Sequence, residues 1–229
     1  MSDTRLGPIA ELRKLAARAR ARGVGDIAHL TLDRLKENLA SSETLIVFVR
    51  SAEGERRPTE GLILRRATTE DADRYASDIG TDSADTFTRR LSDATRCYVV
   101  VGSNGTFLHA TWITNKAAWT RELRAYFRPP PGDAYVFESF TRADARGKGA
   151  YPFALREICH QLSAEGVARV WVAVEVDNIP SLKAVVKGGF EEAWRVTYRR
   201  RLGILRIGAP RGPGASVDGH IWISRRPEG

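Results

Sequence analysis

The sequence predicts a mixed α/β (α+β) domain, a central sheet flanked by helices, with a helical appendage at its N-terminus. Three observations support this prediction. The aromatic and β-branched run Tyr135–Phe137 leads into a glycine-bearing turn at residues 146–149, after which an apolar pattern of helical period begins. Residues 170–176 (VWVAVEV) form a second strand pattern, followed by a short helical one. Residues 97–113 contain two strand patterns joined by a Ser-Asn-Gly turn, which predicts a hairpin.

The composition limits the domain organisation and the classes of partner. A chain of 229 residues, 42% hydrophobic and 28% charged, is long enough for one domain with an appendage. The formal net charge of +8 favours anionic partners, which include nucleic acid, phospholipid and phosphorylated cofactors. Cys97 and Cys159 are too few for a disulfide framework and lack zinc-site spacing, so we expect core thiols and no metal. No apolar run approaches the roughly 18 residues of a membrane span, and no signal peptide is evident, so we expect a cytoplasmic protein.

The first 60 residues predict two helices, one strand and a linker. Residues 8–22 have an alanine-rich apolar face, with proline at the start and glycine after the end. A second helical pattern covers residues 31–39, and the run at 45–49 (LIVFV) is typical of a strand. Residues 51–60 are polar and contain glycine and proline, which indicates a linker. We therefore expect an N-terminal helical appendage with one strand (1–56), a main domain (57–203) and a basic C-terminal tail (204–229).

The main domain begins at Leu62, and its remaining elements follow in order. We expect a first strand from residue 62, short helices at 70–79 and 85–94, strands at 97–101 and 107–113, a last core strand at 194–202 and an added edge strand at 220–224. The long segment 115–133 carries Trp119, Tyr126 and Phe127. A loop of this length is usually functional or disordered, and its aromatic residues favour a packed lid or acceptor wall.

The turn at residues 146–149 (RGKG) has the properties of an anion-binding loop. Its two glycines allow backbone N–H groups to turn inward, and the following helix adds the positive end of its dipole. Arg146 and Lys148 supply full charges, which suit a phosphate or pyrophosphate. A Walker loop would need a hydroxyl residue where Gly149 stands, and a dinucleotide fingerprint would need glycine in place of Pro152.

Residues 144–149 (DARGKG) resemble the acyl-CoA pyrophosphate loop of the GNAT (Gcn5-related) N-acetyltransferases, Q/R-x-x-G-x-G/A, with Asp144 replacing Gln or Arg. Two downstream segments also resemble this family: Asn-x-x-Ser at 178–181, which opens a helix, and the Gly-Phe that ends it near residue 190. Upstream, residues 61–72 resemble the family's first strand and the start of its first helix. The resemblance extends to about residue 203.

The resemblance implies a GNAT-like, mostly antiparallel central sheet and an acyl-CoA-binding domain at residues 57–203. It implies an N-acyltransferase with acetyl-CoA, or another short acyl-CoA, as cosubstrate. The residues matching the cofactor site are Phe140, Thr141, Arg146, Gly147, Lys148, Gly149, Ala150, Asn178 and Ser181. Asn178 and Ser181 have a second interpretation, because both residue types also close the first turn of a helix.

The resemblance further implies direct attack of a primary amine on the thioester, with a carboxylate base in or beside the fourth strand. Glu138 stands there, and partial burial would raise its pKa into a useful range; the alternative is a solvent-facing strand residue. The family's leaving-group acid is a tyrosine, but its position here is Val185. We take Tyr198 as the candidate acid, with Ser181 and Tyr151 as alternatives.

The Gly-Ala-Tyr-Pro sequence at the exit of the loop and the Asn-x-x-Ser motif resemble the branch of the GNAT family that serves surface-sugar or specialised-metabolite pathways. The resemblance therefore implies a small-molecule amine as the acceptor. A homodimer is one possible oligomeric state of the chain. Val185 motivates the alternative of a non-catalytic CoA-binding or interaction module. The arginine-rich C-terminal region motivates an aminoacyl-tRNA acceptor or RNA binding, which ranks third because no RNA-binding motif with stacking aromatics is found.

Overall fold

The computed structural model describes residues 40–54, 59–120, 123–201, 204–213 and 222–224. The helices predicted at 8–22 and 31–39 lie outside these residues. No helix in the described ranges is long and apolar enough to cross a membrane.

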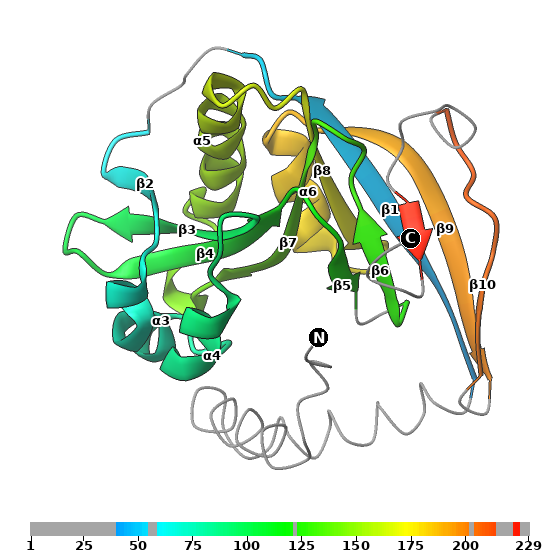
Figure 1. The fold of residues 1–229 in the computed structure, drawn as a ribbon, viewed down its shortest axis with the longest axis horizontal. Helices are drawn as coiled ribbons and strands as arrows, with labels where there is room; N and C mark the ends of the chain where they lie inside the picture. The colour runs from blue at the N-terminus through cyan, green and yellow to red at the C-terminus, as the bar shows by residue number, and fades with distance from the viewer. Residues whose placement is uncertain (1–39, 55–58, 121–122, 202–203, 214–221, 225–229) are drawn as a thin grey trace.

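The described chain forms a mixed sheet of eight strands and a small sheet of three (Figure 1). The strands are β1 (Ala40–Ser51), β2 (Leu62–Arg66), β3 (Thr95–Gly102), β4 (Phe107–Thr114), β5 (Ala118–Thr120), β6 (Ala125–Arg128), β7 (Ala134–Thr141), β8 (Arg169–Glu175), β9 (Glu191–Arg201), β10 (Ile204–Ile207) and β11 (Trp222–Ser224). The helices are η1 (Thr69–Asp71), α3 (Ala72–Asp78), α4 (Ala84–Arg90), η2 (Ala143–Ala145), α5 (Ala150–Ala164) and α6 (Ile179–Lys187).

The large sheet has the order β10-β9-β1-β8-β7-β4-β3-β2. Its neighbours are antiparallel except for β7 and β8, which run parallel. Parallel neighbours need a crossover, and α5 provides it. The predicted fold class, a mostly antiparallel sheet flanked by helices, is therefore confirmed.

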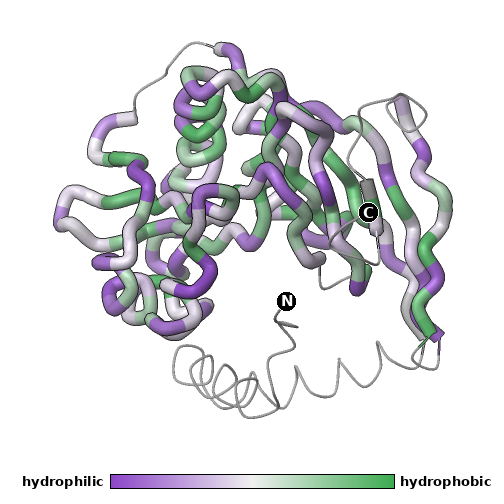
Figure 2. Tube along the Cα trace, in the orientation of Figure 1, coloured by the Kyte–Doolittle hydropathy of each residue, from purple (hydrophilic) through white to green (hydrophobic). Residues whose placement is uncertain are grey.

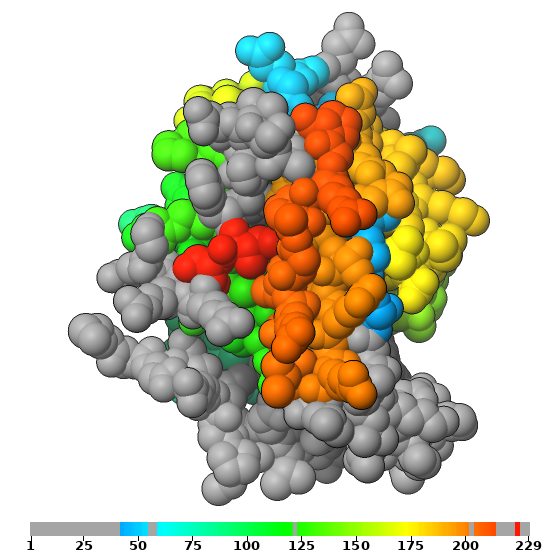
Figure 3. Space-filling model, turned by 90° about the vertical axis from the view of Figure 1, so that its right-hand side faces the viewer, coloured from blue at the N-terminus to red at the C-terminus, as the bar shows by residue number. Residues whose placement is uncertain are grey.

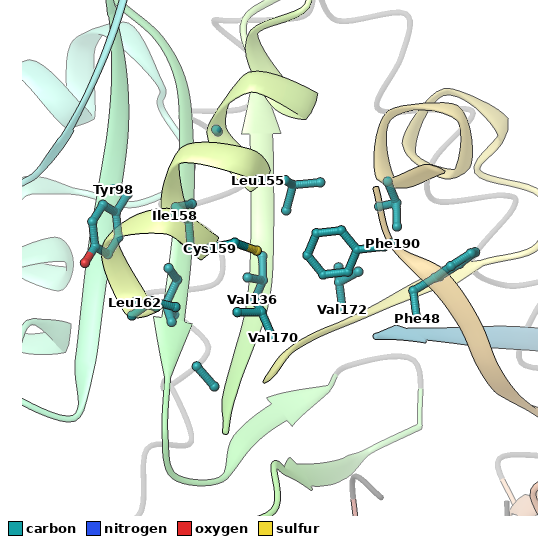
Figure 4. Packing of buried hydrophobic residues seen from close by; sticks show 14 of the residues in the cluster. Phe48, Tyr98, Val136, Leu155, Ile158, Cys159, Leu162, Val170, Val172 and Phe190 are labelled. Carbon is teal, nitrogen blue, oxygen red and sulfur yellow. The ribbon is translucent and has the colours of Figure 1, made fainter. Parts of the chain in front are cut away.

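The helix α5 covers one face of the large sheet. Pro152 stands in its first turn, where its missing N–H has no helical partner to lose, and Gly166 follows its end with φ of 83°. Figure 2 shows hydrophobic residues recurring along α5 and the central strands. In Figure 4, side chains of α5 point toward those of β7 and β8: Leu155, Ile158, Cys159, Leu162, Val136, Val170 and Val172. Both cysteines are buried free thiols, as predicted.

The small sheet covers the opposite face of the large one. The predicted aromatic loop at 115–133 contains β5 and β6, and β6 also pairs with β11, so the strand expected near residues 220–224 forms here. Phe127 is buried in the cluster between the two sheets. Trp119 stays 47% exposed and packs edge-on against Tyr126, with ring centroids 5.0 Å apart. This segment is therefore a packed hairpin with an aromatic outer face.

The strand predicted at 45–49 forms, but it is an interior strand of the large sheet rather than part of an appendage. β1 pairs with β8 from Leu45 to Ser51 and with β9 from Ala40 to Val49. Leu45 and Ile46 are both buried although they face opposite sides of the strand. A continuous apolar run is typical of a strand covered on both faces, which explains its composition.

Deleting residues 1–56 should therefore abolish folding, because it removes an interior strand and leaves the facing edges of β8 and β9 unpaired. Expression as insoluble protein, or loss of the cooperative thermal transition, is the expected result. Deletion of residues 1–39 is the control, since it leaves every described strand in place. A soluble, cooperatively unfolding 57–229 fragment would contradict this prediction.

Candidate active site

The site begins where the parallel strands β7 and β8 part. They pair only from Ala134↔Val170 to Val136↔Val172, although both strands continue for three or more residues. Beyond Val136, β7 leads to the glycine loop and α5, while β8 leads to Asn178 and α6. Because carboxyl ends of parallel strands meet at one edge, the starts of both helices lie at that edge.

A bulge in β7 determines the direction of Glu138. In the pairing with β4, Phe137 stands opposite Trp112 and Phe140 opposite Ala110, so Glu138 and its neighbour together face one residue of β4. Glu138 has φ of 48°, a left-handed conformation uncommon outside glycine. Its side chain is 47% exposed, so it is partly buried and accessible from solvent.

The Glu138 carboxylate contacts a guanidinium that sequence analysis did not identify. Nη1 of Arg90, at the end of α4, lies 2.7 Å from Oε2 of Glu138 and also forms an ion pair with Asp82. The guanidinium stacks on the Trp112 ring at 4.1 Å from its centroid. Burial acts to lower the pKa of Arg90, but the charges of Glu138 and Asp82 outweigh it and raise this pKa. Arg90 therefore stays charged and holds Glu138 in place.

The glycine loop presents open backbone toward solvent. Gly147 and Gly149 have φ of 76° and 80°, and a Cβ on either would meet nothing within 4 Å. Their amides donate to no acceptor in the described ranges of the chain. Arg146 and Lys148 are exposed beside them, and the 15-residue helix α5 starts at the next residue, Ala150. Free amides, two cations and a helix N-terminus form an anion-binding arrangement.

Asp144 departs from the family motif, and its charge is paired locally. Its carboxylate accepts hydrogen bonds from Nε and Nη2 of Arg142 at 3.0 and 2.8 Å. The hydrogen bond from Arg142 lowers the pKa of Asp144, so the carboxyl stays ionised and paired. The loop therefore tolerates an acidic residue at this position.

Asn178 caps α6. Its Oδ1 accepts a hydrogen bond from the backbone N–H of Ser181 at 3.3 Å, so the capping interpretation is observed for both residues. The Nδ2 group is still able to donate, and a contact of Asn178 or Ser181 with CoA stays a prediction. Val185 belongs to α6 and is fully buried in the core.

Thr141 ends β7 in a buried polar cluster below the start of α5. Nδ1 of His109 lies 2.7 Å from the Thr141 hydroxyl, and the imidazole stacks on Tyr151, with ring centroids 4.8 Å apart. Burial raises the pKa of Tyr151 to about 12 and lowers that of His109 to about 3. Of the other residues matched to the cofactor site, Ala150 is buried and Phe140 packs against the cluster that contains Trp112.

The burial of His109 predicts a pH dependence of stability. Its native pKa of about 3 lies below the unfolded value near 6.5, so between these values the unfolded chain binds more protons. The contribution of neutral His109 to the free energy of unfolding is fully present above pH 6.5. It is lost as the pH falls toward 3, by up to about 4 kcal/mol. Denaturant unfolding across this pH range should show that His109→Gln flattens the slope of the free energy of unfolding against pH. The exposed His160 provides the control: His160→Gln should leave the slope unchanged, and an unchanged slope in both variants would contradict the prediction.

Tyr198 lies on the face away from α5. Its fully buried hydroxyl is 2.5 Å from a carboxylate oxygen of Glu43 and 2.7 Å from one of Glu175, at the end of β8. Burial and both carboxylates raise the pKa of Tyr198. A phenol with a raised pKa gives up its proton less readily, which argues against Tyr198 as the acid for a departing thiolate; the acid role of Tyr198 stays a prediction.

No model of a known protein family matches the sequence, and no curated protein matches it. Solved structures match its fold. A GCN5-related N-acetyltransferase from Sphaerobacter thermophilus aligns over 75% of this chain and 56% of its own, with 13% identity and a TM-score of 0.50. The ribosomal-protein-S18-alanine N-acetyltransferase of Escherichia coli aligns over 58% and 79%, with 18% identity and a TM-score of 0.44. An aminoglycoside 6'-N-acetyltransferase from Acinetobacter baumannii aligns over 58% and 92%, with 10% identity and a TM-score of 0.43.

The assignment of the fold rests on the Sphaerobacter thermophilus structure and on the topology described above. The chain spans 56% to 65% of the length of three of the structures that it matches. The glycine loop between β7 and α5 lies where the resemblance in sequence placed it. The chain therefore has the fold of the GCN5-related N-acetyltransferases.

Proposed function

We propose that the protein is an N-acyltransferase that moves an acetyl or short acyl group from acyl-CoA to a primary amine of a small molecule. The observation that carries this proposal is the loop at Gly147 and Gly149, whose free amides stand at the start of α5 beside the parting strands β7 and β8. The pyrophosphate of CoA is the anion that this arrangement suits in a chain of this fold. A sugar amine or specialised metabolite is the proposed acceptor.

The proposed chemistry is a direct transfer. The amine nitrogen forms a bond to the thioester carbonyl carbon, the carbon–sulfur bond then breaks, and the thiolate of CoA leaves. The ammonium proton passes to the carboxylate of Glu138, directly or through water. Arg90 positions that carboxylate from α4, and a half-exposed side chain at the parting of β7 and β8 is accessible to an amine. Alignment of the two substrates supplies much of the rate.

The leaving thiolate needs no tyrosine in this proposal. Val185 is a core residue, and the pKa values of Tyr198 and Tyr151 are both raised. A thiol ionises near pH 8.5, so the thiolate is a tolerable leaving group and takes its proton from water. Tyr198 then serves to hold Glu43 and Glu175 at the ends of their strands.

Calorimetry with CoA, followed by a thiol-release assay with acetyl-CoA and a panel of amino sugars and other amines, tests the proposed function. Micromolar binding and amine-dependent thiol release are expected. Binding without amine-dependent release would favour the non-catalytic CoA-binding module that Val185 suggests. Absence of CoA binding by a folded protein would overturn the proposal.

A further inference from the structure

The bulge in β7 interrupts the backbone pairing at the position that carries Glu138. The register with β4 leaves Glu138 and Ser139 together opposite Thr111, so this part of the ladder is irregular. On its other edge, β7 pairs with β8 only as far as Val136. The position of Glu138 therefore depends on side-chain contacts more than it would inside a regular ladder.

Side-chain hydroxyl groups tie the bulge to β4 and to α5. The Oγ of Ser139 lies 2.6 Å from Oγ1 of Thr111, which is a hydrogen bond across the bulge. Thr111 is fully buried on β4, so this end of the contact is held by the core. Ser139 also hydrogen-bonds to the hydroxyl of Tyr151, the second residue of α5; this contact acts to lower the pKa of Tyr151, although burial outweighs it.

The ring of Tyr151 is itself held in one orientation. It stacks on the imidazole of His109, with ring centroids 4.8 Å apart and ring planes tilted by 24°. His109 is fully buried, and its Nδ1 lies 2.7 Å from the hydroxyl of Thr141 at the end of β7. Packing and hydrogen bonds of this kind fix the rotamer of a side chain that supports a site.

Tyr151 and Ser139 connect the two halves of the proposed site. Tyr151 follows two residues after Gly149, the last glycine of the loop, and Ser139 follows directly after Glu138. Successive residues of a strand point to opposite faces, and Glu138 contacts Arg90 of α4 on the face away from Tyr151. The segment that carries the proposed base is therefore held from both faces of the sheet.

We propose that Tyr151 and Ser139 are positioning residues of the proposed acyl transfer, and that their contact sets the distance between Glu138 and the cofactor loop. Neither side chain exchanges a proton with a substrate in this role. Direct transfer needs the base, the amine and the thioester in alignment, and a misplacement of about 1 Å can lower the rate about a hundredfold. The inference rests on the proposed function, because the contact has no such role without a base and a cofactor.

Kinetics of the full chain with Tyr151→Phe, Ser139→Ala and both substitutions test the proposal. Phenylalanine keeps the ring on His109, so Tyr151→Phe removes the hydroxyl alone. Each single variant should lower turnover at saturating acetyl-CoA and amine by about tenfold or more, with CoA affinity by calorimetry changing less than about threefold. The acidic limb of the pH profile should stay, because Glu138 is still present. The double variant should be about as slow as Ser139→Ala, because both substitutions remove the same contact.

Thr197→Val is the matched control. The hydroxyl of Thr197 lies 3.2 Å from that of Thr44 on the neighbouring strand β1, so this variant also loses a hydroxyl contact between strands. Thr197 is exposed on β9, and Figure 3 shows that β9 and β10 form much of the surface on that side of the molecule. Turnover should stay within about threefold of the parent. Thermal unfolding of all the variants verifies that they are folded.

Two results would overturn the inference and leave the proposed function in place. Turnover within about threefold of the parent in both single variants, whatever the affinity for CoA, would show that the contact does not position the base. Losses that multiply in the double variant would show that the two residues act separately. If Ser139→Ala does not fold, the comparison of turnover with CoA affinity in Tyr151→Phe decides. A parent protein without CoA binding or amine-dependent thiol release would overturn both the inference and the proposed function.

Discussion

Replacing Glu138 with glutamine should lower turnover by about a hundredfold to ten-thousandfold while affinity for CoA changes little. Glutamine keeps the size of the side chain and can still accept a hydrogen bond from Arg90, so the bulge in β7 is retained. It cannot take the proton of the ammonium group. The measurements are steady-state kinetics for turnover and calorimetry for CoA affinity.

Glu192→Gln is the matched control. Glu192 also contacts an arginine, Arg195, and is partly exposed on a strand, but it lies on β9. The same loss of charge and of an ion pair should therefore leave turnover within about threefold of the parent.

The pH dependence separates a base from a positioning residue. In the parent, turnover should fall at acidic pH because protonation removes the general base or the free amine, and only the contribution of the base disappears in the variant. A tenfold or smaller loss with an unchanged acidic limb would contradict the base role. It would indicate that the amine arrives deprotonated and that alignment carries the reaction.

The predictable parts of this molecule are those fixed by local pattern. The period of the apolar residues in α5 and the hairpin turn before β4 each depend on a few consecutive residues. The glycine loop was recognisable for the same reason, because φ values near 80° at Gly147 and Gly149 require glycine. Local rules therefore predicted the loop that we propose for the cofactor.

The parts that sequence reasoning missed depend on pairing between distant segments. Whether β1 joins the main sheet is decided by its pairing with β8 and β9, more than 100 residues away in the chain. The bulge at Glu138 arises from register with β4, and its partner Arg90 comes from a separate helix. An apolar run buried on both faces was the available signal for β1. No comparable signal in the sequence linked Arg90 to Glu138.

The surroundings of Tyr198 could not be predicted from the sequence for a related reason. A tyrosine at the end of a strand is chemically suitable, but its acidity is set by the groups around it. Glu43 and Glu175 come from two other strands, and only the order β9-β1-β8 brings them to the phenol.

Replacing Gly149 with valine should reduce CoA affinity at least about a hundredfold, because the side chain would stand where the pyrophosphate must approach the amides of the loop. The added atoms meet no protein atom within 4 Å, so packing within the protein does not oppose the change. The left-handed φ of 80° at this position does oppose valine, and it should lower the stability by about 1–3 kcal/mol. Calorimetry with CoA measures the affinity, and denaturant unfolding measures the stability.

Gly105→Val separates the loss of affinity from the loss of stability. Gly105 has φ of 79° and open space around its Cβ position, like Gly149, but it lies in the hairpin between β3 and β4. Both variants should lose similar stability, and only Gly149→Val should lose CoA binding. Equal CoA affinity in the two folded variants would mean that the loop at residues 146–149 is only a turn between strand and helix. The proposed cofactor site would then have to lie elsewhere on the sheet.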